Sequence, residues 1–173
     1  MNITGAQGDK QQVMTTRHSN QEEQGTPIRL YTIGSGGRSA ESFFLTLRRA
    51  GIRRLIDIRL HNTSHLAGFT KQQDLRFFLK EICQATYVHE PRLAPTEDLL
   101  SGYHKKTITW AELESRFRSL LESREIDAFL DPQSFRVTPS VLLCSEPKPD
   151  KCHRGLVAEY LKRMWGEVLI IHL

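Results

Sequence analysis

Apolar positions follow two different periods along the chain, and these periods predict its elements. Short β-rich or alternating runs predict five strands, at residues 28–33, 53–60, 86–90, 140–145 and 167–173. Between these runs, apolar residues recur at helical spacing, around Phe43, Leu75, Leu113 and Leu156. Strands that alternate with helices predict a single compact α/β domain. Its mostly parallel sheet of about five strands carries helices on both faces.

Local signals set several helix boundaries. Ser39 precedes the first helix as an N-cap, and Gly51 follows it as a helix-ending glycine. Thr109 and Glu112 have the spacing of a capping box ahead of another helix. Residues 123–139 have a weaker pattern, which predicts one more helical turn and then a loop.

The first 27 residues differ from the rest in composition. They are rich in Gln, Thr, Asn, Gly and Ser and have almost no apolar periodicity, so residues 1–27 are predicted to be a disordered polar leader. Residues 28–173 then form the domain. The whole chain has a net charge of +4 and the leader is slightly acidic, so the domain is slightly more basic than the whole chain. A mildly basic domain suits an anionic ligand, although it lacks the dense basic stripe of a dedicated DNA-coating protein.

Cysteine usage and hydropathy bear on the compartment. The three cysteines form no framework typical of secreted proteins, and an odd count leaves at least one thiol free. No apolar run approaches the length of a membrane span, and the leader has no hydrophobic signal core. We therefore expect a cytoplasmic protein with no membrane partner.

Polar and glycine residues follow four of the predicted strands. In open α/β sheets, ligands bind outside the carboxyl ends of the strands, so these residues are the candidate site. They are Ser35, Gly36 and Arg38 after the first strand, Asp57 and Arg59 at the second, His89 at the third, and Ser145 and Glu146 at the fourth. The segment "GSGGR" lacks the ending of a P-loop, but its glycines allow close backbone approach and Arg38 has the reach to contact a phosphate.

Asp57 and Arg59 are two residues apart on a strand, so their side chains leave by one face while Ile56 and Ile58 take the other. A carboxylate in such an apolar strand needs a partner, because an unpaired buried charge costs several kcal/mol. Two interpretations follow: a charged site residue oriented by a cation, or a structural carboxylate that holds an arginine.

The segment "CHRG" places His153 and Arg154 in the first turn of a predicted helix, where the helix dipole disfavours cations. A bound anion would reverse that penalty, so the pattern favours an anion site. In the alternative, Arg154 pairs with Glu146 or Asp57. Cys152 at the same helix start is a candidate nucleophile, redox thiol or buried residue. The spacing of Cys144, Cys152 and His153 is not that of a zinc site, and no metal or cofactor is expected.

Several segments together resemble the domain of unknown function 488 family. They are "YTIG", "LIDIR", "NTSHLAGF", "YVHEPRLAPT", "LLCSEPKPDKCHRGLVAEYL" and "VLIIHL". "NTSHLAGF" and "LAPT" are similar to one bacterial subgroup. The resemblance implies a compact α/β fold and a polar cluster that includes Asp57, Arg59, Glu146, Cys152, His153 and Arg154, but no reaction. Many members of the family carry His at the position of Ser35.

The residues predict a crevice for a small anionic ligand that carries phosphate, such as a nucleotide or a nucleic-acid end. Arg38, Arg59 and Arg154 would neutralise the anion, Asp57 or Glu146 would act as general acid or base, and His153 would assist. Hydrolysis and group transfer both fit these roles. One alternative is a non-catalytic module that binds a ligand or nucleic acid. Another is a thiol-dependent enzyme that uses Cys152.

Overall fold

The computed structural model describes Met1 and residues 25–63 and 65–173. The predicted polar leader therefore lies almost entirely outside the described residues. The sheet consists of β1 (Ile28–Gly34), β2 (Arg54–Asp57), β3 (Thr86–His89), β4 (Ser140–Cys144) and β5 (Val168–His172). Its strand order is β3-β2-β4-β1-β5, and every pair is parallel. Five parallel strands with helices between them confirm the predicted fold class.

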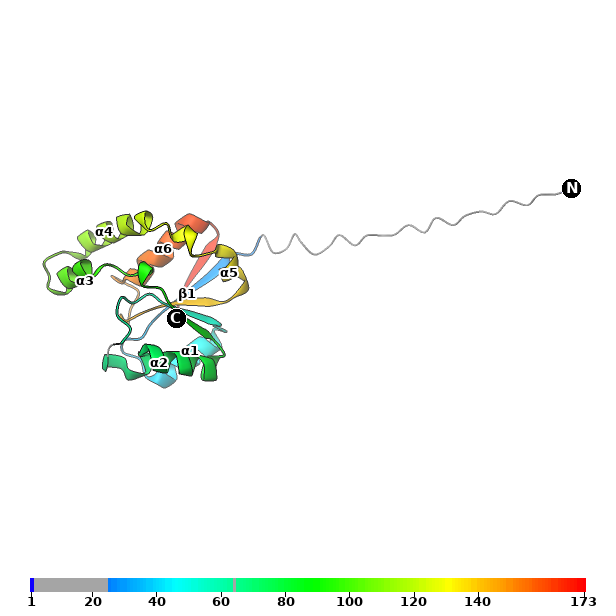
Figure 1. The fold of residues 1–173 in the computed structure, drawn as a ribbon, viewed down its shortest axis with the longest axis horizontal. Coiled ribbons are helices and arrows are strands. Elements are labelled where there is room, and N and C mark those ends of the chain that lie inside the picture. Colours follow the sequence, from blue (N-terminus) through cyan, green and yellow to red (C-terminus); the bar gives the residue numbers. More distant parts are fainter. Residues whose placement is uncertain (2–24, 64) are drawn as a thin grey trace.

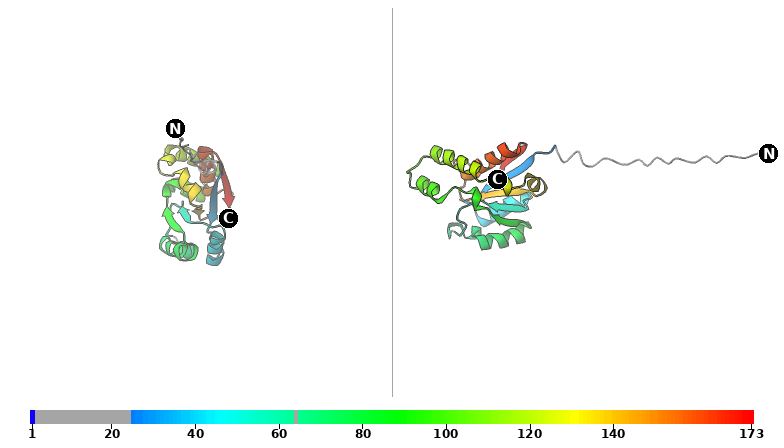
Figure 2. Two further views of the ribbon diagram at one scale, coloured as in Figure 1. Left: turned by 90° about the vertical axis from the view of Figure 1, so that its right-hand side faces the viewer. Right: turned by 45° about the horizontal axis from the view of Figure 1, so that its top comes forward.

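Helices cover both faces of this sheet (Figures 1 and 2). One face carries α1 (Ala40–Arg49) and α2 (Gln72–Phe78), which runs into a π-helical turn, η2 (Leu79–Cys83). The other carries α3 (Glu97–His104), α4 (Trp110–Ser123), α5 (Pro132–Val137) and α6 (His153–Trp165). Short 3₁₀ turns complete the fold: η1 (His65–Thr70), η3 (Pro91–Leu93) and η4 (Ile126–Ala128).

The strand order explains which helix covers which face. From β1 to β3 the chain moves toward one edge of the sheet, and from β3 to β5 it moves back toward the other edge. Because crossovers between parallel strands are right-handed, the two directions of travel place their helices on opposite faces. The helices that follow the neighbours β1 and β4 therefore diverge.

Each face has its own hydrophobic core. Phe43, Leu47, Leu55 and Leu143 belong to the core under α1 and α2. The core under α4 and α6 contains Ile56, Ile58, Phe117, Leu142 and Val157. Ile56 and Ile58 thus share one face, as their spacing predicts. Alternation along a strand decides which core a residue joins, and the same rule applies to the residues just beyond the strand ends.

The boundary signals are confirmed in part. Ser39 accepts a hydrogen bond from the Ser42 amide, and Thr109 forms the capping box with Glu112. Helical spacing from Leu75 and Leu79 also predicts a buried Ile82, but Ile82 is exposed while Cys83 is buried. The wider π-helical turn shifts the buried face by one residue.

Two further helices depart from the prediction. The weak segment after α4 holds both η4 and α5, which is one turn more than predicted. α3 precedes the capping box as a separate helix of eight residues. Among the described residues, no helix is both long and apolar enough to cross a membrane.

Candidate functional site

A crevice of about 640 Å³ opens at the carboxyl ends of β1 and β4. Diverging helices leave such a space between neighbouring strands of an open α/β sheet. Five of the predicted site residues line it: Ser35, Gly36, Arg38, Arg59 and Ser145. Gly37, Phe69 and Thr70 line it as well. The crevice lies on the face of the sheet that α1 and α2 cover.

The wall of the crevice requires glycine. The loop after β1 stays hydrogen-bonded to the loop after β4, through Ser35 N to Cys144 O at 3.1 Å and Gly36 N to Ser145 O at 2.9 Å. A Cβ on Gly36 would lie 2.5 Å from the carbonyl oxygen of Ser145. A Cβ on Gly34 would lie 1.8 Å from the carbonyl oxygen of Glu146. The glycines of "GSGGR" therefore allow two backbones to approach each other.

Asp57 and Arg59 form a buried bidentate ion pair. Arg59 donates from Nε to Asp57 Oδ1 at 2.8 Å and from Nη2 to Oδ2 at 2.6 Å. It also donates to Thr70 Oγ1 and to the Thr70 carbonyl. Burial alone would lower the pKa of Arg59, but the hydrogen bonds and charge of Asp57 raise it overall. This geometry matches the structural interpretation of Asp57, with its carboxylate holding the arginine that lines the crevice.

Tyr87 and His89 complete the surroundings of this pair. Tyr87 Oη donates to Asp57 Oδ2 at 2.8 Å and accepts from Asn62 Nδ2 at 3.0 Å. Burial raises the pKa of Tyr87, and the neighbouring carboxylate raises it further, so the phenol stays protonated. His89 Nε2 lies 2.9 Å from the carbonyl oxygen of Arg59. His89 thus supports the backbone of Arg59, and it is not among the residues that line the crevice.

Arg38 stands at the rim, where α1 begins. Its guanidinium donates from Nη2 to the main-chain oxygen of Leu173 at 2.7 Å. A guanidinium carries five N–H donors, so this contact leaves Arg38 with further hydrogen-bonding capacity.

The remaining predicted residues lie on the opposite face, under α6, and form what we call the thiol cluster. Its members are Cys144, Glu146, Cys152, His153 and Arg154. Cys144 follows Leu142 by two residues, so its side chain points to the same α6 side of the sheet. Cys152 is the N-cap residue of α6. The two Sγ atoms lie 3.1 Å apart.

The protein's own groups occupy the start of α6. The protonated thiol of Cys152 donates from Sγ to Glu146 Oε2 at 3.2 Å, and His153 Nδ1 lies 3.8 Å from the same oxygen. His153 Nε2 is 3.1 Å from the carbonyl oxygen of Ile58. A carboxylate and a thiol of the chain itself therefore occupy the helix start at which the sequence predicts a bound anion.

Arg154 is buried in the thiol cluster. Its Nη1 donates at 2.6 Å to Cys144 Sγ and at 2.6 Å to the carbonyl oxygen of Glu146. It lies 3.4 Å from Cys152 Sγ. Arg154 is 1% exposed and does not line the crevice, so it pairs with sulfur and with a main-chain oxygen, and with neither Asp57 nor the Glu146 carboxylate.

The two thiols titrate in opposite directions. The hydrogen bond from Cys144 and the neighbouring His153 together lower the pKa of Cys152 to about 6, against the effect of its burial. Burial raises the pKa of Cys144 well above the ordinary value, and the neighbouring Cys152 raises it further. For His153, burial lowers the pKa, but Cys152 and Glu146 raise it overall. Near neutral pH the cluster therefore favours a thiolate at Cys152 beside a protonated Cys144 thiol, and the sulfur and the carboxylate favour the charged form of His153.

A metal ion would find ligands in the cluster, but also a cation. One atom each of Cys144, Glu146 and Cys152 lie within 4.8 Å of one another. Two thiolates and a carboxylate are donors that zinc accepts. The Arg154 guanidinium, however, touches both sulfurs, and a divalent cation between them would repel it. This donor set suits a thiolate held by an arginine better than a metal.

A family model for the domain of unknown function DUF488 matches residues 39–161, which is most of the chain. The chain belongs to this family. The match begins at Ser39, after the crevice residues of the loop that follows β1, and it includes Arg59, Ser145 and the thiol cluster. No curated protein and no solved structure gives a significant match.

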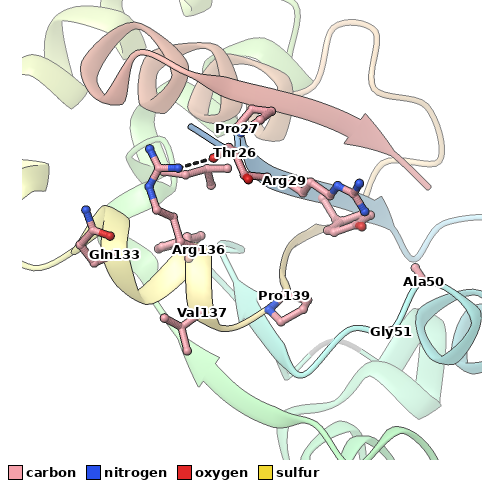
Figure 3. A pocket seen from close by; sticks show the side chains of 12 residues that line it. Thr26, Pro27, Arg29, Ala50, Gly51, Gln133, Arg136, Val137 and Pro139 are labelled. Atoms are coloured by element: carbon pink, nitrogen blue, oxygen red, sulfur yellow. Dashed lines mark hydrogen bonds between the residues drawn. The ribbon is translucent and has the colours of Figure 1, made fainter. Parts of the chain in front are cut away.

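A second cavity, also of about 640 Å³, lies at the amino ends of the strands of this DUF488 domain (Figure 3). Arg136 reaches across it to the carbonyl oxygen of Thr26, and Val137 and Arg29 also line it. Among the described residues that line it there is no cysteine, histidine or carboxylate. The predicted polar site residues lie at the other ends of the strands, the carboxyl ends.

The predicted residues thus gather at the carboxyl ends of the strands, but on opposite faces of the sheet. Sequence reasoning missed Tyr87 and Thr70, which hold the ion pair, and gave Cys144 no role. The alternation of Ile33, Gly34 and Ser35 predicts the division between the two faces, because neighbouring residues on a strand point to opposite faces of the sheet.

Proposed function

We propose that this DUF488 protein binds a phosphate-bearing anion, such as a nucleotide or a nucleic-acid end, in the crevice beside β1 and β4. The observation that carries the proposal is a cavity of ligand size at the divergence of α1 and α6, with Arg38 and Arg59 among its lining residues. A volume of about 640 Å³ is typical of small-molecule sites.

The backbone supports the same ligand class. Gly36 and Gly37 bring main-chain groups to the crevice wall, and α1 begins beside them with its N-terminus and dipole. Arg38 adds a planar fork of donors, which matches phosphate oxygens. The basic excess of the domain favours encounter with anions in solution.

The proposal is for binding, and it includes no reaction at Asp57. Both carboxylate oxygens of Asp57 accept hydrogen bonds, from Arg59 and Tyr87, so this carboxylate is not available as a general base. Glu146 and His153 belong to the opposite face. This arrangement favours the non-catalytic alternative over hydrolysis or group transfer in the crevice.

Thermal unfolding of the full chain tests the proposal, with inorganic phosphate, nucleotides, sugar phosphates and the unphosphorylated nucleosides as ligands. A ligand at 100 times its dissociation constant stabilises the folded state by about 2.7 kcal/mol. For a chain of this size, that corresponds to a rise in Tm of roughly 5–10 °C. We expect the phosphorylated compounds to raise Tm, and their nucleosides to leave it unchanged.

Arg38→Ala supplies the decisive comparison. It removes a guanidinium from the rim and should weaken binding at least tenfold by calorimetry, since charge-assisted hydrogen bonds contribute about 1.5–3 kcal/mol each. Arg49→Ala is the matched control, because Arg49 lies at the other end of α1 and is exposed. Equal affinities for the two variants, or equal shifts with nucleoside and nucleotide, would reject the proposal.

A further inference from the structure

The pair of thiols beneath α6 has the geometry of a dithiol that closes readily. Cys144 and Cys152 bring their sulfur atoms to 3.1 Å, and a disulfide bond is about 2.05 Å long. An approach of about 1 Å would therefore join them. We propose that Cys144 and Cys152 form a redox-active dithiol that reduces a small hydroperoxide and closes to a disulfide. This site lies on the other face of the sheet from the proposed ligand crevice and does not depend on it.

Cys152 is the thiol that attacks. It lies at the N-terminus of α6, a helix of 13 residues, where the dipole favours a negative charge. The groups that face it are Cys144, Glu146, His153 and Arg154, and the hydrogen bond from Cys144 together with His153 favours the thiolate over the opposing carboxylate. The preceding Lys151 is exposed. The thiolate at Cys152 and the protonated thiol at Cys144 divide the roles of attacking and resolving sulfur.

Burial selects the size of the oxidant. Cys152 is 2% exposed and Cys144 is fully buried. The Glu146 side chain beside them is 38% exposed, so the approach from solvent passes along this carboxylate. A hydroperoxide of a few atoms fits such a path, whereas a bulky peptide disulfide does not.

The chemistry balances without a cofactor. The Cys152 thiolate attacks one peroxide oxygen, an S–O bond forms, the O–O bond breaks, and the leaving hydroxide takes a proton from His153. The sulfur of Cys144 then attacks the sulfenic acid at Cys152, which forms the S–S bond. The departing hydroxide leaves as water with the proton of the Cys144 thiol. Two electrons pass from the thiols to the peroxide, which becomes two water molecules, once a proton from solvent has restored His153.

Hydrogen peroxide is the probe for the test, added in slight excess to the reduced full chain at neutral pH. Intact mass spectrometry should show the loss of two hydrogen atoms, and peptide mapping should link Cys144 to Cys152. Dithiothreitol should restore both thiols. This measurement needs no variant, so it stands even if substitutions in the cluster impair folding.

Three variants assign the roles. Cys144→Ser should leave a sulfenic acid at Cys152, seen as the gain of one oxygen atom by intact mass spectrometry, and Cys152→Ser should give neither product. Cys83→Ser is the matched control and should form the disulfide like the wild type. Cys83 is buried near the Phe44 carbonyl, and burial raises its pKa.

Two results would overturn the inference. One is oxidation of Cys152 to sulfinic acid in the wild type without a link to Cys144. The other is a purified chain that holds stoichiometric zinc, with thiols that stay unreactive until the metal is removed. Either result would show that the short distance between the sulfurs serves something other than disulfide formation.

Discussion

Asp57→Asn tests whether the buried carboxylate is structural. The substitution keeps the shape of the side chain but removes its charge. Arg59, which is 5% exposed, then remains charged without its partner, and the fully buried position of Asp57 holds an amide against two guanidinium donors. Breaking a buried pair by removing one partner costs about 3–5 kcal/mol. That is a large share of the roughly 5–15 kcal/mol that stabilises a typical domain.

Urea unfolding followed by tryptophan fluorescence measures this cost. The matched control is Glu114→Gln, which removes the charge of an i,i+4 pair with Arg118 on the surface of α4. That pair should contribute only about 0.3–0.5 kcal/mol. The double variant Asp57→Asn/Arg59→Met should recover part of the loss, because no charge is left buried. A cost below about 1 kcal/mol for Asp57→Asn, or one equal to the control, would refute the structural interpretation.

Two further predictions concern the thiol cluster and the glycine contact. Alkylation of Cys152 by iodoacetamide should reach half its maximal rate near pH 6, since its pKa is about 6 and only the thiolate reacts. His153→Gln should move this midpoint to higher pH, and a wild-type midpoint near the ordinary value of about 8.5 would contradict the geometry. Gly34→Ala should destabilise the fold by about 1–3 kcal/mol in urea, because its Cβ would meet a carbonyl oxygen at 1.8 Å. Gly68→Ala has open space, and a comparable loss there would show that the close approach is not the cause.

Much of the fold follows from periodicity alone. The five strands appear within three residues of their predicted ends, because each is an apolar run between clear breaks. The errors concern the buried face of the turn after α2 and the number of helical turns after α4. The π-helical turn leaves Ile82 exposed, and α5 forms in a weakly patterned segment because Asp131 caps it and Pro132 opens it. The cap and the proline of α5 are local signals that the sequence carries, whereas the π-helical turn depends on packing between elements.

The sequence predicts at which end of the strands the candidate site lies, but it does not predict on which face of the sheet each residue lies. The rule that ligands bind at the carboxyl ends of strands correctly selects residues from four strands, but it does not distinguish the two faces of the sheet. Which of two adjacent residues faces α1 and which faces α6 depends on the order of β1 and β4 in the sheet. That order comes from long-range pairing, which no local pattern contains. For this reason Arg154 was expected beside Arg38 and Arg59, although the sheet separates them.

The loop at residues 145–147 separates the crevice from the thiol cluster. Ser145 faces the crevice, while the carbonyl of Glu146, one residue later, accepts the Arg154 guanidinium of the thiol cluster. A bound anion that moved this loop would act on the thiol cluster, and thermodynamic reciprocity would make the effect equal in both directions. Whatever factor disulfide closure imposes on the affinity of a guest, that guest must impose on the reduction equilibrium of the sulfurs.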